Sequence, residues 1–323
     1  MRNATALASW DAALEAYLAS RRALGRAYEG EERVLRAVRT HLARLRRRDL
    51  DATSFGHWRA QLDHCAPNTR CDYAMIVYRF CRYRRRRDPA CFLPDRATLE
   101  RRRPYPLPSP VEDRQVAQLL RFLAAFGACS SRPLRRPALR LAILLMYTAG
   151  LRRGEVARLR LEDVDPVAGV LRIRASKFHK SRWVPLSAST ARELRRYLQS
   201  RRAVVPQRGG ATPLLWSCAT RAYSPQGLSN AVKALMLSSG VWNAAPRLAR
   251  VHDFRHGFAV GALRRWYEAG ADVQSELPKL AMYMGHVSIA SSAHYLRYMP
   301  AVVALAGERF ARSCGDLVDG GAP

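Results

Sequence analysis

Ten residues, 101–110, constrain the fold more than any other part of the sequence. The run reads Arg-Arg-Arg-Pro-Tyr-Pro-Leu-Pro-Ser-Pro and so contains four prolines. Because proline lacks a backbone N–H and imposes extended geometry, this run fits neither a helix nor the middle of a sheet. We therefore expect two domains, residues 1–100 and 111–323, joined by a semi-rigid linker at 101–110. A capping box from Ser109 to Glu112 is expected to start the first helix of the second domain.

The first domain is predicted to be helical, because its apolar residues recur with the three- and four-residue spacing of an α-helix. No strand pattern accompanies them. Pro67 suits the first turn of the last helix, where a missing N–H costs nothing. The apolar stripes are Trp10, Leu14, Tyr17 and Leu18; Val34, Leu35, Val38, Leu42 and Leu45; and Tyr73, Ile76, Val77 and Phe80.

The second domain is predicted to be α+β, with helices and a small antiparallel sheet. Apolar and polar residues alternate at 171–174, and a second short strand is expected at 183–186, so the two should form a hairpin with Lys177 near its tip. A turn is expected at Gly150. The helices are expected at about 137–148, 155–159, 190–202, 225–238, 253–267 and 277–284.

The charge of the chain favours a nucleic-acid partner. The 55 Lys and Arg residues against 26 Asp and Glu leave a formal net charge of +29 and a pI near 11.1. A charge of this size attracts polyanions with an affinity that depends on salt. Most of the excess is arginine, whose planar guanidinium binds a phosphate through two parallel hydrogen bonds.

Two arginine runs on the polar faces of the N-terminal helices are candidates for phosphate contact. A solvated helix face is the alternative for either run. Because few acidic residues accompany them, we favour contact with the DNA backbone, which would position a duplex without reading its sequence. The candidates are Arg46, Arg47, Arg48, Arg84, Arg85, Arg86 and Arg87.

Cysteine usage and missing motifs limit the chemistry. The seven cysteines are odd in number and include no Cys-x-x-Cys pair, so we expect reduced thiols. The sequence has no His-Glu-x-x-His motif, no paired carboxylate cluster and no Gly-x-x-x-x-Gly-Lys loop, so we predict no metal and no nucleotide cofactor. It also shows neither a signal peptide nor an apolar run of about 18 residues, so we expect a cytoplasmic protein outside the membrane.

The second domain contains the side chains needed to break a phosphodiester bond by attack of a phenol. Negative charge that develops on the non-bridging oxygens has to be met by fixed cations. The phenol has to lose a proton and the departing oxygen has to gain one, so a base and an acid are also required. Candidate residues occur in the motifs Gly150-Leu151-Arg152, Lys177 in the predicted hairpin, His252-Asp253-Phe254-Arg255-His256, Gly285-His286 and Tyr295.

In order and spacing, these motifs resemble the tyrosine recombinase, or phage integrase, family. The first arginine precedes the lysine by 25 residues, and His286 precedes Tyr295 by 9. The helical first domain is similar, more weakly, to the family's core-binding domain. The resemblance implies that both domains close round double-stranded DNA as a C-shaped clamp. It further implies a homotetramer that exchanges strands through a Holliday junction, here most simply for a mobile element.

The resemblance also implies a role for each residue. Arg152 and Arg255 would contact the scissile phosphate, and Tyr295 would form a covalent 3′-phosphotyrosine that stores the bond energy, so that no ATP is needed. His252 would be the base and Lys177 the acid. Lys180 is the nearby alternative to this lysine, and Tyr298 is the alternative to the tyrosine.

Other residues would support this set. His286 would hydrogen-bond the scissile phosphate or the leaving oxygen. Three more residues match family positions that hold the arginines and His252 in place, although helix capping or packing is an alternative for each. They are Glu155, Asp253 and His256.

Two other functions stay open at this point. A type IB topoisomerase uses a similar residue set but relaxes supercoils without a specific site, and a non-catalytic relative would bind DNA only. The segment 301–310 could pack against a neighbouring protomer or against its own domain.

Overall fold

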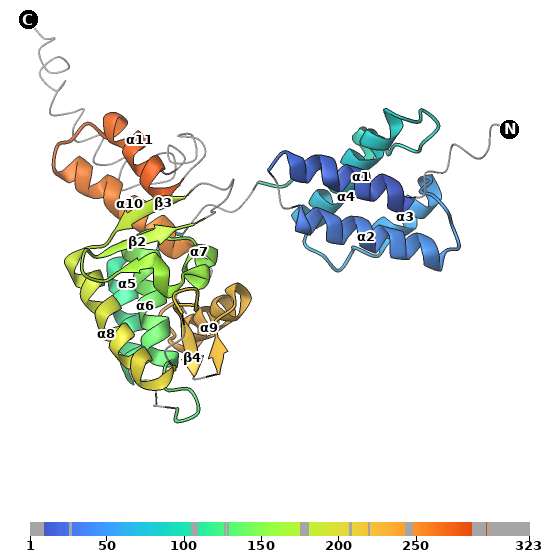
Figure 1. Ribbon diagram of the computed structural model, residues 1–323. Helices are drawn as coiled ribbons and strands as arrows, with labels where there is room; N and C mark the ends of the chain where they lie inside the picture. Colours follow the sequence, from blue (N-terminus) through green and yellow to red (C-terminus); the bar gives the residue numbers. More distant parts are fainter. Residues whose placement is uncertain are drawn as a thin grey trace, which may run out of the picture. The chain divides into compact units, whose positions relative to one another are not determined.

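The structure is a computed structural model that describes residues 10–25, 28–104, 109–125, 127, 129–174, 181–206, 209–218, 220–242, 248–285 and 295. The chain divides into two compact units, Met1–Pro106 and Leu107–Pro323. This division falls inside the proline-rich run that the sequence predicts as a linker. We call the parts the N-terminal unit and the C-terminal unit (Figure 1).

The described part of the N-terminal unit is a bundle of helices whose core is built from the predicted apolar stripes. Trp10 and Tyr17 pack on Phe80, with ring centroids 4.9 and 5.4 Å apart. Pro67 occupies the first turn of its helix, as predicted. The elements are α1 (Trp10–Ala23), α2 (Glu29–Arg44), α3 (Ala52–Ala60), α4 (Pro67–Arg85) and the 3₁₀-helix η1 (Arg96–Thr98).

The prediction that Leu45 continues the apolar stripe of α2 is wrong. The helix ends at Arg44, and the Leu45 side chain is 38% exposed. Arg46 has a positive φ of 53°, which turns the chain away from the helix. Helix α3 was not predicted, because nine residues with two buried aromatic side chains are too few to establish a helical period.

Arg84 is buried, and the prediction that it contacts DNA is wrong. Its side chain is 7% exposed, and its two terminal nitrogens each donate to the Asp49 carboxylate at 2.6 Å. The guanidinium also lies over the rings of Trp10 and Phe80. Helical geometry explains this placement, because residues four apart share a face, and Phe80 faces the core.

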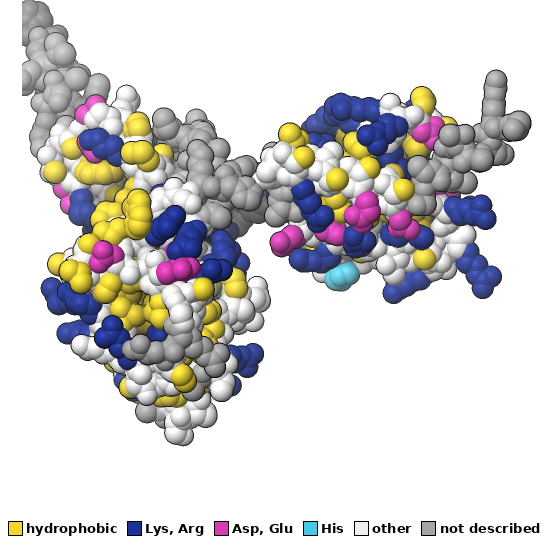
Figure 2. Space-filling model, in the orientation of Figure 1, with side chains coloured by type: hydrophobic (Ala, Val, Ile, Leu, Met, Phe, Trp, Pro, Cys, Tyr) yellow, Lys and Arg dark blue, Asp and Glu magenta, His cyan; other side chains and the backbone are white. Residues whose placement is uncertain are grey.

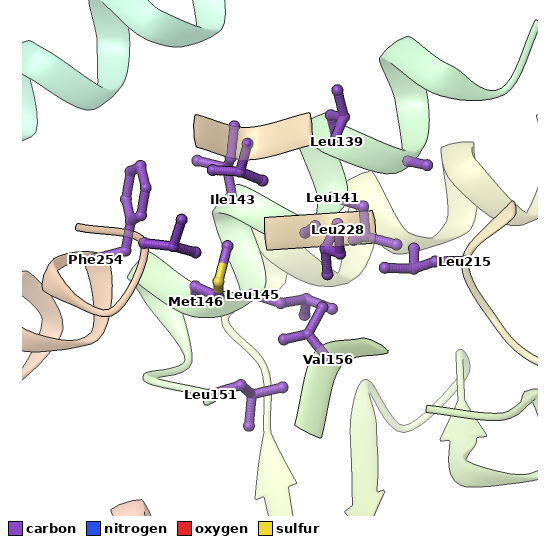
Figure 3. Close-up of a cluster of buried hydrophobic side chains, with 14 of the residues drawn as sticks. Leu139, Leu141, Ile143, Leu145, Met146, Leu151, Val156, Leu215, Leu228 and Phe254 are labelled. Carbon is purple, nitrogen blue, oxygen red and sulfur yellow. The ribbon is translucent and has the colours of Figure 1, made fainter. Parts of the chain in front are cut away.

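In the C-terminal unit, α6 is the central helix. It contacts α5, α7, α8, α9, α10 and strand β4, and its leucine, isoleucine and methionine side chains are buried on several sides (Figure 3). A helix surrounded in this way is apolar around most of its circumference. The helices are α5 (Asp113–Ala125), α6 (Arg135–Thr148), α7 (Arg153–Arg158), η2 (Leu161–Asp163), α8 (Ala188–Val204), α9 (Pro225–Ser238), α10 (Asp253–Glu268) and α11 (Val273–Met284).

A three-stranded antiparallel sheet packs beside these helices, in the order β1 (Val164–Asp165), β2 (Val170–Ile173), β3 (Arg182–Pro185). The predicted pairing of the second and third strands is confirmed, with Leu171 opposite Val184. Side chains alternate between the core and solvent, as the period of a strand requires. A second pair, β4 (Trp216–Cys218) and β5 (Arg221–Ala222), was not predicted because each strand is too short to show alternation.

The predicted capping box before α5 is wrong. The helix begins at Asp113, and the backbone N–H of Glu112 donates to the side-chain oxygen of Gln115 at 3.0 Å. In a capping box, the side chain three residues into the helix accepts a hydrogen bond from the N-cap N–H. Gln115 fills this position in the structure, where the sequence predicts Glu112. The mixed helical and antiparallel architecture is confirmed. None of the described helices is both long and apolar enough to cross a bilayer.

Replacing Arg84 with alanine is expected to lower the free energy of unfolding by about 2 kcal/mol, because Asp49 then keeps a partly buried charge without its partner. Native-state hydrogen exchange at the amides of α1 and α4 measures this loss. Arg85→Ala is the control, since Arg85 is exposed on the same helix, and should change stability by less than about 0.5 kcal/mol. Equal effects of the two substitutions would mean that the ion pair adds nothing.

Candidate active site

A glycine turn between α6 and α7 positions the first arginine of the site. Gly150 has a φ of +61°, a left-handed conformation that glycine adopts without steric cost. A Cβ atom at this position would lie 2.5 Å from the Phe258 ring, so α10 packs directly on the turn. Arg152 follows as the N-cap residue of α7. The turn therefore brings Arg152 beside the helix that carries Arg255.

Glu155 holds Arg152 through two hydrogen bonds. Its carboxylate accepts one from the backbone N–H and one from Nη1 of Arg152, both at 2.9 Å. Burial raises the pKa of Glu155, but hydrogen bonds and charges from Arg182 and Arg152 outweigh burial and lower it to about 2. Glu155 is therefore ionised at neutral pH, and the expected support of Arg152 is present as a direct ion pair.

Arg255 of α10 is enclosed, with 1% of the residue exposed. Its Nη1 donates to the carbonyl of Gly150 and its Nη2 to the carbonyl of Met284, the latter at 2.7 Å. Burial and the nearby charge of Arg152 lower the pKa of Arg255 to about 9. This value is still above neutral pH, so the side chain keeps its positive charge.

The C-terminal end of α11 accepts hydrogen bonds from several arginines. Arg152 donates to the carbonyls of Met284 at 3.3 Å and Gly285 at 2.9 Å, and Arg182 Nε donates to that of Tyr283 at 2.7 Å. The last carbonyls of a helix have no partner within it and carry partial negative charge. These contacts fix the chain immediately before His286.

Arg182 was not identified from the sequence as a site residue. Its Nη1 and Nη2 both donate to the Glu155 carboxylate at 3.0 Å, and its side chain is 12% exposed. A signal for it was present, because alternation along β3 places Arg182 on the same side of the strand as the buried Val184. An arginine at an inward position predicts a buried acidic partner.

Tyr295 is buried beside His256. Its Oη lies 3.0 Å from Nδ1 of His256, and the residue is 5% exposed. The His256 ring also lies 4.8 Å from that of His252, centroid to centroid. The sequence predicts that His256 supports His252 and the arginines, whereas its direct contact in the structure is with the phenol.

Both histidines are uncharged at neutral pH in the free protein. Burial, together with the charges of Arg255 and Arg152, lowers the pKa of His252 to about 4. Burial and the neighbouring His252 lower the pKa of His256 to about 3. A neutral imidazole can accept a proton, as a general base must.

Asp253, at the start of α10, is fully buried. Its carboxylate accepts hydrogen bonds from the backbone N–H of Arg250 at 2.8 Å and from Nη2 of Arg250 at 3.2 Å. One of its oxygens lies 3.9 Å from His256 Nε2. Asp253 therefore fixes the chain that leads into α10, and its charge acts against burial by raising the pKa of both histidines.

Two predicted site residues, Lys177 and His286, lie outside the described residues. The alternatives Lys180 and Tyr298 do so as well. Within the described ranges, no three His, Cys, Asp or Glu side chains are grouped closely enough to bind a metal ion. The absence of a cofactor stays a prediction from the sequence.

Lowering the pH from about 7 to 5 is expected to destabilise the C-terminal unit in the absence of DNA. His252 and His256 have folded pKa values of about 4 and 3, below the ordinary 6.5, so in this window the unfolded chain binds protons that the folded chain does not. The contribution of the two neutral histidines to the free energy of unfolding is fully present above pH 6.5. It is lost as the pH falls, by up to about 1.4 kcal/mol per pH unit for each histidine.

Denaturant titrations at pH 7, 6 and 5 measure this slope. His256→Gln removes one of the two groups and should flatten the dependence, whatever its effect on stability at pH 7. An unchanged slope in the variant would mean that His256 is not the source of the dependence.

Comparison with known proteins gives a consistent assignment. The model of the phage integrase family matches residues 111–300, a range that includes Arg152, Arg255 and Tyr295. The putative integrase/recombinase y4rE of Sinorhizobium fredii is 32% identical over 318 residues, 96% of each chain. The putative integrase/recombinase y4rB of the same organism is 35% identical over 263 residues, 80% of this chain and 81% of that one.

Solved structures share the fold. The Tn1549 transposon integrase in complex with transposon right end DNA has a TM-score of 0.65 and 16% identity, over 94% of this chain and 99% of that one. The XerH site-specific recombinase bound to its palindromic difH substrate has a TM-score of 0.59 and 17% identity, over 80% and 72%. By its sequence motifs and family match, this chain belongs to the phage integrase family of tyrosine recombinases, which are DNA strand-transferases.

Proposed function

We propose that this protein is a site-specific recombinase that cuts and rejoins DNA through a covalent bond between Tyr295 and a 3′ phosphate. One observation carries the proposal: the buried phenol lies within the electrostatic field of Arg255 and Arg152. Burial raises the pKa of Tyr295, and the charges of these two arginines oppose that effect. A nucleophile and two cations, from segments far apart in the sequence, are thus gathered in one place.

In the proposed reaction, the Tyr295 oxygen attacks phosphorus and displaces the 5′ oxygen of the next nucleotide. The phenol gives its proton to a base, and the departing oxygen takes one from an acid. Arg152 and Arg255 offset the charge on the non-bridging oxygens, and removal of one such donor typically costs about 3 to 4 kcal/mol in the transition state. Attack of a 5′ hydroxyl on the phosphotyrosine reverses the step without ATP.

We assign the base to His252 and propose that His256 holds the phenol before DNA arrives. By the family resemblance this imidazole is the base, and the charges of Arg255 and Arg152 both lower its pKa. His256 instead hydrogen-bonds the phenol itself. Lys177 is the proposed acid, and His286 the proposed partner of the phosphate or the leaving oxygen.

By likeness to the relatives, we propose that the substrate is duplex DNA at a specific site. The Tn1549 integrase and XerH were each solved with DNA. The same proposal includes a homotetramer that joins two sites through a Holliday junction. It also includes service to a mobile element by integration, excision or resolution.

Covalent chemistry can be tested with a nicked duplex that loses the 5′ fragment after cleavage and so traps the intermediate. Candidate sites come from DNA flanking the gene, and EDTA is present throughout. We expect an adduct that withstands denaturant and that Tyr295→Phe abolishes, while DNA affinity is retained because only the hydroxyl is removed. Tyr298→Phe is the matched control and should keep the adduct.

The outcomes separate the candidate functions. An adduct at one site, with no relaxation of other supercoiled DNA, supports a recombinase. Relaxation of any supercoiled plasmid would instead indicate a topoisomerase. Tight binding without an adduct at any flanking site would favour a non-catalytic relative.

The N-terminal unit has a basic surface suited to the DNA backbone (Figure 2). Of the predicted contacts, Arg46, Arg47 and Arg48 are exposed beyond α2, and Arg85, Arg86 and Arg87 are exposed at the end of α4. The arginine run from Arg84 to Arg87 therefore lies on two sides of the helix, because Arg84 faces the core. We propose that the exposed members contact phosphates.

A small pocket between α1 and α4 extends this surface. It has a volume of about 180 Å³ and is lined by Arg21, Arg79, Arg82, Tyr83 and Arg86. Arg79, Arg82 and Arg86 follow one another at helical spacing and so share a face. All three of these side chains are exposed, so this face can offer several guanidinium groups to one backbone phosphate.

Replacing Arg79 and Arg86 together with glutamine is expected to weaken DNA binding for specific and non-specific sequences alike. The slope of log affinity against log salt should fall by about one for each phosphate that the variant no longer binds. Fluorescence anisotropy with a labelled duplex at several salt concentrations measures both quantities.

The control carries the same change of charge. On α2, Arg36 is exposed and Arg39 is half-buried, but each is already paired with a carboxylate. The double variant Arg36→Gln/Arg39→Gln should therefore lower the slope less. Equal slopes for the two double variants would mean that only the net charge of the protein matters. The proposal that the pocket binds a phosphate would then be wrong.

A further inference from the structure

Arg182 joins three separate elements at a single guanidinium group. It belongs to β3, its Nη atoms donate to Glu155 of α7, and its Nε donates to the carbonyl of Tyr283 at the end of α11. Arg152 uses the same carboxylate and the two carbonyls that follow Tyr283. The contacts of Arg182 thus run parallel to those of Arg152, one residue earlier along α11.

The geometry shows how Arg182 fixes Arg152. Each Glu155 oxygen accepts from both residues: Oε1 from Nη1 of Arg152 at 2.9 Å and Nη1 of Arg182 at 3.0 Å, and Oε2 from the Arg152 N–H at 2.9 Å and Nη2 of Arg182 at 3.0 Å. A bidentate guanidinium sets the plane of the carboxylate as well as its distance. Without it, the carboxylate could rotate about its last side-chain bond, and Arg152 Nη1 would turn with it.

Burial makes this fixation effective. The side chains of Glu155 and Arg182 are 2% and 12% exposed, so water cannot easily replace a missing hydrogen bond. The Arg152 side chain, at 24% exposed, is the most accessible of the three. Arg182 is therefore placed behind Arg152, on the side away from solvent.

We propose that Arg182 is a positioning residue, which acts through Glu155 to aim Arg152 at the scissile phosphate without touching the DNA. The inference rests on the proposed recombinase function, since it assumes that Arg152 meets a phosphate. Misplacing a catalytic group by about 1 Å can cost on the order of 100-fold in rate. Lysine at position 182 keeps the charge but cannot make the bidentate pair.

The test compares two substrates that differ in charge at the scissile position. One is the nicked phosphodiester duplex, and the other carries a methylphosphonate, in which a methyl group replaces a charged non-bridging oxygen. An arginine that offsets this charge matters less when the charge is absent. We expect Arg182→Lys and Arg182→Gln to slow adduct formation by roughly 10-fold and 100-fold on the phosphodiester, and by less than about 3-fold on the methylphosphonate.

Two comparisons show whether the effect passes through Arg152 and Glu155. Arg152→Lys should show the same dependence on substrate. The double variant Glu155→Gln/Arg182→Gln should be no slower than Glu155→Gln alone, because residues that act in series are not additive. Arg174→Lys is the control, since Arg174, which directly follows β2, also pairs with acidic residues, Glu162 at 3.0 Å and Asp163. It should react like the wild type on both substrates.

The inference would be overturned if the Arg182 variants slowed adduct formation equally on both substrates, or if the two effects multiplied in the double variant. Arg182 would then only stabilise the fold. A second readout does not require catalysis. Nuclear magnetic resonance of arginine side chains should show hindered rotation of the Arg152 guanidinium in the wild type and averaged rotation in Arg182→Lys. Hindered rotation in both would refute positioning. A wild-type protein without adduct at any site would count against the proposed function alone.

Discussion

The buried Glu155 carboxylate is the contact on which the site depends. It lies between Arg152 and Arg182 and stays ionised because their charges outweigh the cost of its burial. Arg255, close by, hydrogen-bonds backbone carbonyls. The described cluster therefore contains more positive than negative charge in a largely buried place. Such an excess is costly in a folded protein, and a bound phosphodiester would relieve it.

The end of α11 holds the arginines of this cluster together. Its last carbonyls hold three arginines that come from a turn, a strand and a helix. An arginine has five N–H donors, so one guanidinium can bind acceptors from several segments at once. The same carbonyls lie directly before the segment that leads to Tyr295. One helix end therefore sets the positions of all three arginines.

Much of this arrangement could be predicted from the sequence, for physical reasons that vary by element. Helix α9 was predicted at its observed bounds, because a proline and a capping serine start it and its apolar period is regular. The start of α5 was missed, because several residues near Asp113 could cap a helix and local sequence does not choose among them. The burial of Arg84 and Arg182 was missed for a shared reason. Each side chain is buried in an ion pair with an acidic residue distant in sequence, whereas charge composition alone indicates a surface position for both.

The protonation of the site in the free protein need not be that of the site with DNA. Positive charge from Arg152 and Arg255, added to burial, keeps His252 neutral and makes it a weak base. A bound phosphodiester brings a negative charge next to the same arginines, and a nearby opposite charge favours the protonated imidazole. In the proposed reaction, DNA would thus raise the basicity of His252 when a proton has to be removed from Tyr295. In the free protein, the buried phenol hydrogen-bonds a neutral His256, so in this proposal the charge of the bound phosphate would also determine when the phenol can lose its proton.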